Sequence, residues 1–152
     1  GSEMCIRDRT KIIPRDSQAE EGLDHYNKCQ PPTAGFAEQV FYHEMAADQD
    51  NHVYVAIVNK SFNNGHGIGL YVKYHKTQLP KFVQWKMMDE RGYVIGLEPA
   101  NCWVDGRKKE RQSGTLDYLE PGGRRHYEIE IGVLTSNREI DKFLSKVRQN
   151  SE

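Results

Sequence analysis

Short runs of alternating apolar and polar residues recur along the middle of this chain, and such alternation is typical of β-strands with one buried face. The clearest run covers residues 126–133. Its apolar residues, which we expect to face inward, are Tyr127, Ile129, Ile131 and Val133. Two further runs, residues 38–45 and 68–75, alternate in the same way, and the first of them has Gln39 and His43 on one face.

Three more strands and a helix complete the main predicted elements. Residues 53–58 are apolar on both faces, as expected for a central strand, and residues 82–88 and 92–98 form a hairpin across a polar turn. A capping box at residues 136–139 begins a C-terminal helix with one apolar stripe. Six strands and one helix predict an all-β, mostly antiparallel sandwich or barrel.

The start of the chain has no such pattern. Residues 1–10 are interpreted as a tag or disordered leader, which leaves residues 11–152 as one domain. Within the leader, residues 4–9 are similar to translated adapter sequence at the ends of metagenomic reading frames. Residues 11–14 are expected to form a short edge strand, and residues 16–28 to form at most two helical turns with Ser17 as the N-cap.

Composition narrows the function classes. The 152 residues suffice for one hydrophobic core, and a net charge of -1 without long blocks of one sign argues against a nucleic-acid or membrane surface. No apolar run approaches the ~18 residues of a membrane span. Three cysteines without metal-ligand spacing indicate reduced thiols in a cytoplasmic protein. The mean hydropathy of -0.80 fits a chain that completes its burial against a partner.

Glu98 is the leading candidate for a functional residue. It follows an apolar run, and Pro99 is expected to end strand pairing directly after it, so that the carboxylate projects from the end of a rigid strand. Asn101, Asp105 and Arg107 follow in a short loop. This arrangement suits a catalytic or ligand-binding carboxylate. The structural alternative is a strand-end glutamate that only accepts hydrogen bonds from turn amides.

Other chemistries find less support in the sequence. The six histidines show no H-x-H or H-x3-H spacing, and the glycine-rich residues 65–69 open a strand and not a helix, so we expect neither a metal nor a cofactor. Acid–base chemistry by Glu98 and a histidine remains. His43 is the best partner, although on the strand pattern alone a hydrogen-bonded core histidine is the simpler explanation. Lys86 could bind a ligand hydroxyl or extend its ammonium to solvent.

Several ordered motifs resemble an uncharacterised bacterial family of aldose 1-epimerase-like proteins in the galactose mutarotase superfamily. The motifs are residues 34–44, 79–80, 84–88, 96–101, 106–107 and 119–122. The resemblance, which runs from about residue 11 to about residue 135, implies a galactose-mutarotase-like β-supersandwich that binds a sugar in a groove across one sheet. It also implies that Glu98 matches the carboxylate that takes the proton of the anomeric hydroxyl, while a histidine protonates the ring oxygen.

The resemblance suggests further ligand contacts and one partner. Besides the catalytic pair Glu98 and His43, the residues expected to bind the sugar are Gln39, Trp85, Lys86, Asn101 and Arg107; Trp103 could also stack on the sugar. Members of the superfamily are about twice this long, and where mutarotases carry an Asn-His pair this chain has Asn59-Lys60. A half-length sandwich exposes a sheet face and edges, so we expect a homodimer.

These observations leave three hypotheses for the function. The first is a mutarotase-like protein that binds a sugar and catalyses aldose 1-epimerisation, or a related carbohydrate transformation, by acid–base chemistry. The second is a non-catalytic carbohydrate-binding module. The third is a metal-dependent β-sandwich enzyme that acts on carbohydrate.

Overall fold

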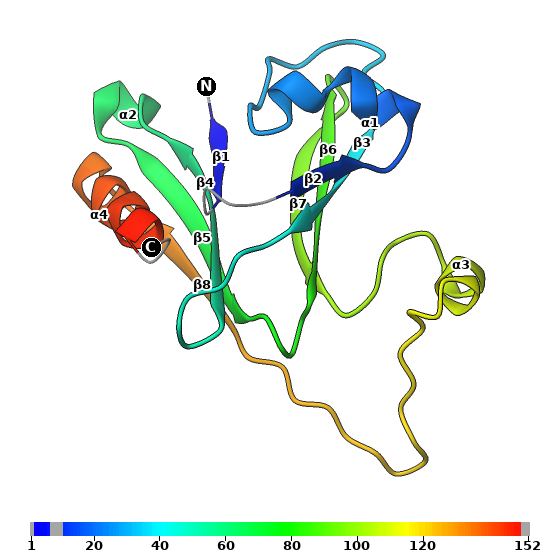
Figure 1. Ribbon diagram of the computed structural model, residues 1–152. Coiled ribbons are helices and arrows are strands. Elements are labelled where there is room, and N and C mark those ends of the chain that lie inside the picture. Colours follow the sequence, from blue (N-terminus) through cyan, green and yellow to red (C-terminus); the bar gives the residue numbers. More distant parts are fainter. Residues whose placement is uncertain (1, 7–10, 150–152) are drawn as a thin grey trace.

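Two four-stranded antiparallel sheets form the body of the molecule in the computed structural model, which describes residues 2–6 and 11–149 (Figure 1). The first sheet has the order β1 (Glu3–Ile6), β4 (His52–Asn59), β5 (Ile68–His75) and β8 (Ile129–Leu134). The second has the order β2 (Lys11–Pro14), β3 (Gln39–Glu44), β6 (Lys81–Asp89) and β7 (Gly92–Ala100). The mostly antiparallel β-sandwich predicted from sequence is therefore confirmed.

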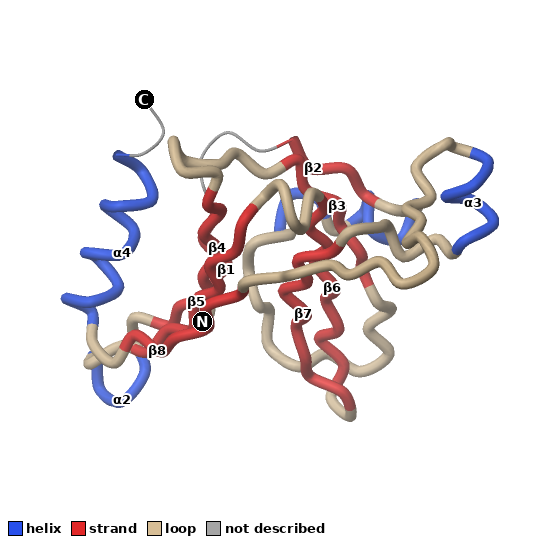
Figure 2. The backbone as a smooth tube through the Cα atoms, turned by 90° about the horizontal axis from the view of Figure 1, so that it is seen from below, coloured by secondary structure: helices blue, strands red, loops and turns tan. Residues whose placement is uncertain are grey.

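Among the described residues, four short helices lie in the connections between the strands, and one longer helix follows the last strand. The short ones are α1 (Ser17–Glu21), the 3-10 helix η1 (Leu23–His25), α2 (Phe62–Gly65) and α3 (Arg107–Gln112). The predicted C-terminal helix is α4 (Asn137–Gln149), and it packs Ile140 and Phe143 against the first sheet. Figure 2 shows α4 and α3 at opposite ends of the molecule. No helix in the described part of the chain is long and apolar enough to cross a membrane.

The core lies between the two sheets. Val53, Val55 and Val72 of the first sheet pack with Phe82 of the second, and the Tyr74 and Phe82 rings stack with centroids 6.2 Å apart. Since Phe82 and Leu97 contact this core, their side of the second sheet is its inner face. Because successive side chains of a strand point to opposite faces, the residues that alternate with these on the same strands form the outer face of that sheet.

The second sheet covers only part of the first. Ile129 and Ile131 on β8 lie opposite Tyr74 and Val72, so they point to the inner side as predicted. They are nevertheless 49% and 66% exposed, and Val133 is 58% exposed. The row therefore faces inward as predicted and yet remains largely exposed in the described part of the chain.

Several local predictions differ from the structure in informative ways. Glu3–Ile6, assigned to the leader, form β1 and pair with β4, while residue 1 and residues 7–10 lie outside the described part of the chain. Asp16, and not Ser17, is the N-cap of α1, since its carboxylate accepts a hydrogen bond from the Ala19 amide at 3.0 Å. The edge strand predicted at residues 11–14 is confirmed as β2.

Candidate functional site

Glu98 lies within strand β7 and not at its end. The strand continues to Ala100, and Pro99 is paired opposite Phe82. The prediction that Pro99 ends the pairing is wrong because β7 is an edge strand, where a missing N–H costs no hydrogen bond if it points away from the sheet. Glu98 lies opposite Val83, which in turn lies opposite Tyr42, so all three side chains share the outer face of the second sheet.

The Glu98 carboxylate is partly buried and free of partners. A Cβ atom built on Gly96 would fall well inside van der Waals contact of Glu98 Oε1, so the carboxylate folds back over that glycine. Trp85 lies opposite Gly96 on the neighbouring strand. Burial raises the pKa of the Glu98 carboxyl above its ordinary value. Within residues 2–6 and 11–149 the carboxylate has neither a hydrogen bond nor an ion pair, so it is available to a ligand.

Two tryptophans pack on the outer face that carries Glu98, and each is held in place by its own contacts. The Trp85 indole N–H donates a hydrogen bond of 2.9 Å to Glu38, which also accepts one of 3.1 Å from Arg15. Trp103 stacks on the Tyr42 ring with centroids 4.5 Å apart and packs on the outer-face cluster that includes Val83. Aromatic rings of this kind can bind the C–H face of a sugar.

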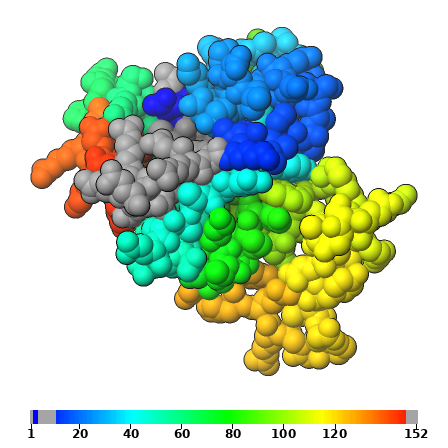
Figure 3. Space-filling view, in the orientation of Figure 1, coloured from blue at the N-terminus to red at the C-terminus, as the bar shows by residue number. Residues whose placement is uncertain are grey.

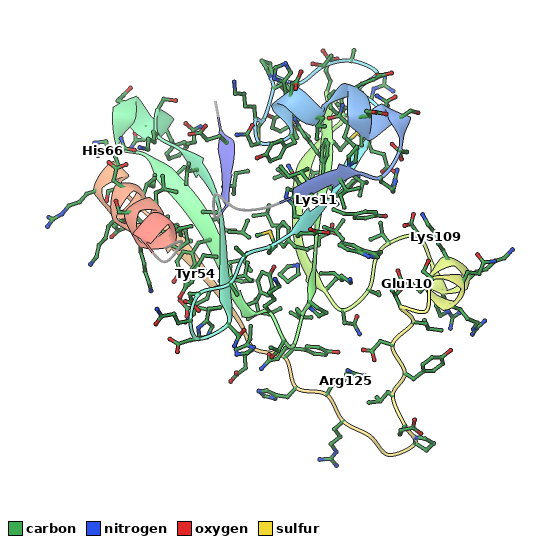
Figure 4. All side chains as sticks on the ribbon, in the orientation of Figure 1. Lys11, Tyr54, His66, Lys109, Glu110 and Arg125 are labelled. Atoms are coloured by element: carbon green, nitrogen blue, oxygen red, sulfur yellow. The ribbon has the colours of Figure 1, made fainter. Side chains whose placement is uncertain are left out.

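The segment after β7 brings Trp103 back over the outer face. Glu110 on α3 is 4% exposed and accepts hydrogen bonds from the Trp103 amide at 3.2 Å and the Thr115 hydroxyl at 2.7 Å. Asp105 accepts a hydrogen bond of 2.9 Å from the Tyr42 hydroxyl. Burial and this contact raise the pKa of Tyr42, which stays a neutral phenol. Figure 4 shows Glu110 and Lys109 on α3, beside the second sheet.

We call the surface formed by Tyr42, Lys81, Trp85, Glu98 and Trp103 the Glu98 face. Lys81 belongs to it because it lies opposite Ala100, two residues beyond Glu98. Its ammonium is 4.7 Å from the centroid of the Trp103 ring. The Glu98 face therefore combines one free carboxylate, one ammonium group and three aromatic side chains.

A different set of polar side chains occupies the inner face of the same sheet. We call Gln39, His43, Gln84 and Lys86 the inner polar cluster. Lys86 donates a hydrogen bond of 2.7 Å to the carbonyl of His25, and Gln84 donates one of 2.6 Å to the carbonyl of Tyr26. These bonds fasten the η1 segment to the sheet. Burial lowers the pKa of Lys86 to about 8.

His43 is in this cluster and is 1% exposed. Its Nε2 lies 3.1 Å from Gln84 Oε1, and its ring packs between Tyr26 and Phe82 at centroid distances of 5.8 and 5.5 Å. Burial lowers its pKa to about 4. Because His43 lies opposite Phe82 and Glu98 lies opposite Val83, the sheet separates the two side chains. The structure therefore does not bring His43 and Glu98 together on one face of the sheet.

The other predicted ligand-binding residues divide in the same way. Trp85 is on the Glu98 face, whereas Gln39 and Lys86 are buried on the inner face, with Gln39 against Gly22. Asn101 follows β7 and donates a hydrogen bond of 3.4 Å to Asp117. Arg107 is exposed at the start of α3. The structure thus brings Glu98 and Trp85 together and keeps Gln39, His43 and Lys86 apart from them.

Asp48, Asp50 and His52 have ligand atoms close enough to hold a metal ion. They lie at the turn between β3 and β4, on different strands from Glu98. The Asp48 carboxylate already accepts hydrogen bonds from the amides of His52 and Asp50 and from the Tyr54 hydroxyl. Those bonds explain the cluster as a turn that holds the start of β4.

Sequence reasoning missed Tyr42 and Lys81. The register of the β6–β7 hairpin would have found Lys81, whereas Tyr42 follows only from the pairing of β3 with β6. Counting back from the polar turn of the hairpin puts Val83 opposite Glu98, and strand alternation then puts Lys81 and Trp85 on the same face.

Comparison with known proteins agrees with the fold and with the resemblance. The sequence profile of a family described as a domain of unknown function (DUF4432) matches residues 1–133. The crystal structure of a protein described as "a putative aldose 1-epimerase", from Klebsiella pneumoniae, superposes with a TM-score of 0.89 at 26% identity. The match covers 100% of this chain and 39% of that one, so the chain spans about two fifths of that protein's length. No curated protein matches the sequence.

Proposed function

This chain belongs to the family described as a domain of unknown function (DUF4432), and we propose that it is a mutarotase-like protein that binds an aldose on the Glu98 face and interconverts its anomers. The aldose 1-epimerase-like fold supports a sugar ligand. The catalysis proposed is acid–base opening and reclosure of the ring, in which Glu98 accepts the proton of the anomeric hydroxyl.

One observation carries this proposal. Glu98 is a carboxylate with a raised pKa and no partner in the described part of the chain, on the outer sheet face that also carries Trp85 and on which Trp103 packs. Leaving a partly buried charge unpaired costs folding free energy, and such groups are more common at functional sites than elsewhere. A carboxylate whose pKa is raised is also a stronger base once it is ionised.

The test is the anomerisation rate of a panel of aldoses, measured by NMR exchange for the wild type and for Glu98→Gln. The substitution keeps the size of the side chain and removes its basicity, so we expect a loss of about 10²–10⁴-fold in kcat. Glu90→Gln, in the exposed turn between β6 and β7, is the matched control and should keep the wild-type rate. A Glu98→Gln rate equal to that of the wild type contradicts the proposal.

A non-catalytic carbohydrate-binding module is the second candidate. The observation that favours it is the burial of His43 on the inner face, which removes the expected proton donor from the Glu98 face. Under this alternative, wild-type protein binds an aldose in NMR titration and accelerates anomerisation of none. Glu98→Gln would then change the affinity for the aldose and would leave the rate of anomerisation at its uncatalysed value.

We also propose a homodimer. The uncovered apolar residues of the first sheet lie on β5 and on the open edge strand β8, where Leu70, Ile131 and Val133 are 40%, 66% and 58% exposed. Exposed apolar strands at a sheet edge favour pairing with a second chain. Light scattering at micromolar concentration should give the mass of a dimer, and a monodisperse monomer would contradict it.

The cytoplasmic location and the single domain of residues 11–152 remain predictions.

A further inference from the structure

We propose that Lys81 is the proton donor that acts with Glu98 on the Glu98 face. The inference rests on the proposed function and supplies the partner that His43 cannot provide from the inner side of the sheet. The first observation behind it is the pairing of β6 with β7. Glu98 lies opposite Val83, and Lys81 is two residues before Val83 on the same strand. Lys81 and Glu98 are therefore diagonal neighbours on one face, with Cα atoms about 7–8 Å apart.

The Lys81 ammonium contacts an aromatic ring and forms no ion pair in the described part of the chain. It lies 4.7 Å from the centroid of the Trp103 ring, within the range of a cation–π interaction. The Trp103 backbone is in turn fixed by Glu110. Within the described ranges 2–6 and 11–149, Lys81 forms no ion pair, and Glu98, the carboxylate diagonal to it on the sheet face, forms none either. A cation and a carboxylate thus lie on one sheet face without forming an ion pair with each other, so both groups remain available to a ligand.

Other proton-bearing groups near this face are already engaged. The Tyr42 hydroxyl donates a hydrogen bond to Asp105. Arg15 is bonded to Asp16 at 2.7 Å and to Glu38 at 3.1 Å, and a guanidinium does not release its proton in proteins. Lys86, the lysine that sequence reasoning selected, is on the inner face and donates to the His25 carbonyl.

The reaction balances with these two residues alone. Glu98 takes the proton from the anomeric hydroxyl, the electrons of that O–H bond form the aldehyde carbonyl, and the bond between the anomeric carbon and the ring oxygen breaks. The ring oxygen takes a proton from the Lys81 ammonium, which becomes an amine. After rotation of the aldehyde, the ring hydroxyl attacks its other face and returns its proton to Lys81, while Glu98 returns its proton to the new anomeric oxygen. Nothing is consumed.

The experiment compares kcat and KM for anomerisation by the wild type, Lys81→Met, Lys81→Arg and Lys60→Met. Methionine keeps the length of the side chain without the proton, and arginine keeps the cation over Trp103 without releasing a proton. We expect both Lys81 variants to lose about 10²–10⁴-fold in kcat with KM within about threefold of the wild type. Lys60, which pairs with Asp141 at the other sheet, is the matched control and should keep the wild-type kcat.

Three outcomes would overturn the inference. A Lys81→Met kcat within threefold of the wild type, with Glu98→Gln inactive, would exclude Lys81 as the proton donor and would leave the proposed function unaffected. A wild-type kcat for Lys81→Arg shows that only the positive charge is needed and that no proton comes from residue 81. Wild-type protein that accelerates no aldose overturns the inference and the proposed function together.

Discussion

The Glu98 carboxylate lies over Gly96, two residues earlier on the same strand and the same face, and occupies space that any larger residue at position 96 would fill. Successive residues of one face are separated by about two strand rises, so a long side chain reaches its neighbour easily. The glycine therefore sets where the carboxylate lies, next to Trp85, and links the backbone of β7 to the proposed chemistry.

Gly96→Ala should displace the carboxylate without unfolding the sheet. We expect a loss of about 10²-fold in kcat, because misplacing a catalytic group by about 1 Å has effects of that size. Gly92→Ala is the matched control on the same strand, since its added Cβ meets only Met87, at 3.9 Å. Anomerisation kinetics and thermal unfolding of both variants check the prediction. Equal kinetics for the two variants would contradict it.

The rate of anomerisation should rise with pH through the pKa of Glu98. Because burial raises that pKa, the rise should be centred above the usual glutamate value of about 4.3. Since the base is the ionised form, activity is lost as pH falls through this pKa. The pH dependence of kcat/KM measures it, and Glu98→Gln should remove this limb of the profile. If kcat/KM of Glu98→Gln still rises with pH over the same range, the titrating group is a residue other than Glu98.

The free energy of unfolding should fall between about pH 6.5 and pH 4 because of His43. Its pKa is lowered to about 4 in the folded protein, so over this range the unfolded chain takes up a proton that the native state does not. The full difference is on the order of 3 kcal/mol, reached below the folded-state pKa. His43→Gln should flatten urea unfolding free energies across this range. A His43→Gln variant with the pH dependence of the wild type would contradict the prediction.

Ile131→Glu should convert the proposed dimer into a monomer. A carboxylate in the middle of the uncovered β8 row would have to be desolvated to bury that row against a second copy. We expect the mass from light scattering to halve while the circular dichroism spectrum stays the same. Gln112→Glu, at the exposed end of α3, introduces the same charge elsewhere and should remain dimeric. Unchanged mass for Ile131→Glu would place any interface elsewhere.

Much of the fold could be predicted from the sequence because its alternation is strong. The strands around Phe41, Val55 and Val72 and the helix beginning at Asn137 were all expected. The site was harder. Alternation separates the two faces of a strand but does not say which face meets the core, and both Tyr42 and His43 are buried. Only the pairing of β3 with β6 shows that Tyr42, and not His43, shares a face with Glu98.

The ends of elements were less predictable for a related reason. Pro99 is read as a strand terminator unless β7 is known to be an edge strand, and edge position is a property of the whole sheet. The exposure of Ile131 has the same origin. Its apolar character and its inward direction are local, whereas the cover it lacks would have to come from a distant part of the structure.

The connection between β7 and β8, residues 101–128, joins the two sheets and stands out from the body of the molecule in Figure 3. It carries exposed basic residues, among them Arg107, Lys108, Arg111 and Arg124, each of which is a cleavage site for trypsin. A single cut at Arg124 would leave Trp103 fastened by Glu110 on one side. On the other side, β8 would be held by its pairing with β5, by α4 and by the hydrogen bonds of Arg125 and Glu128 to the first fragment. Limited proteolysis would thus turn one chain into two fragments that share a fold, with the Glu98 face intact on the first of them.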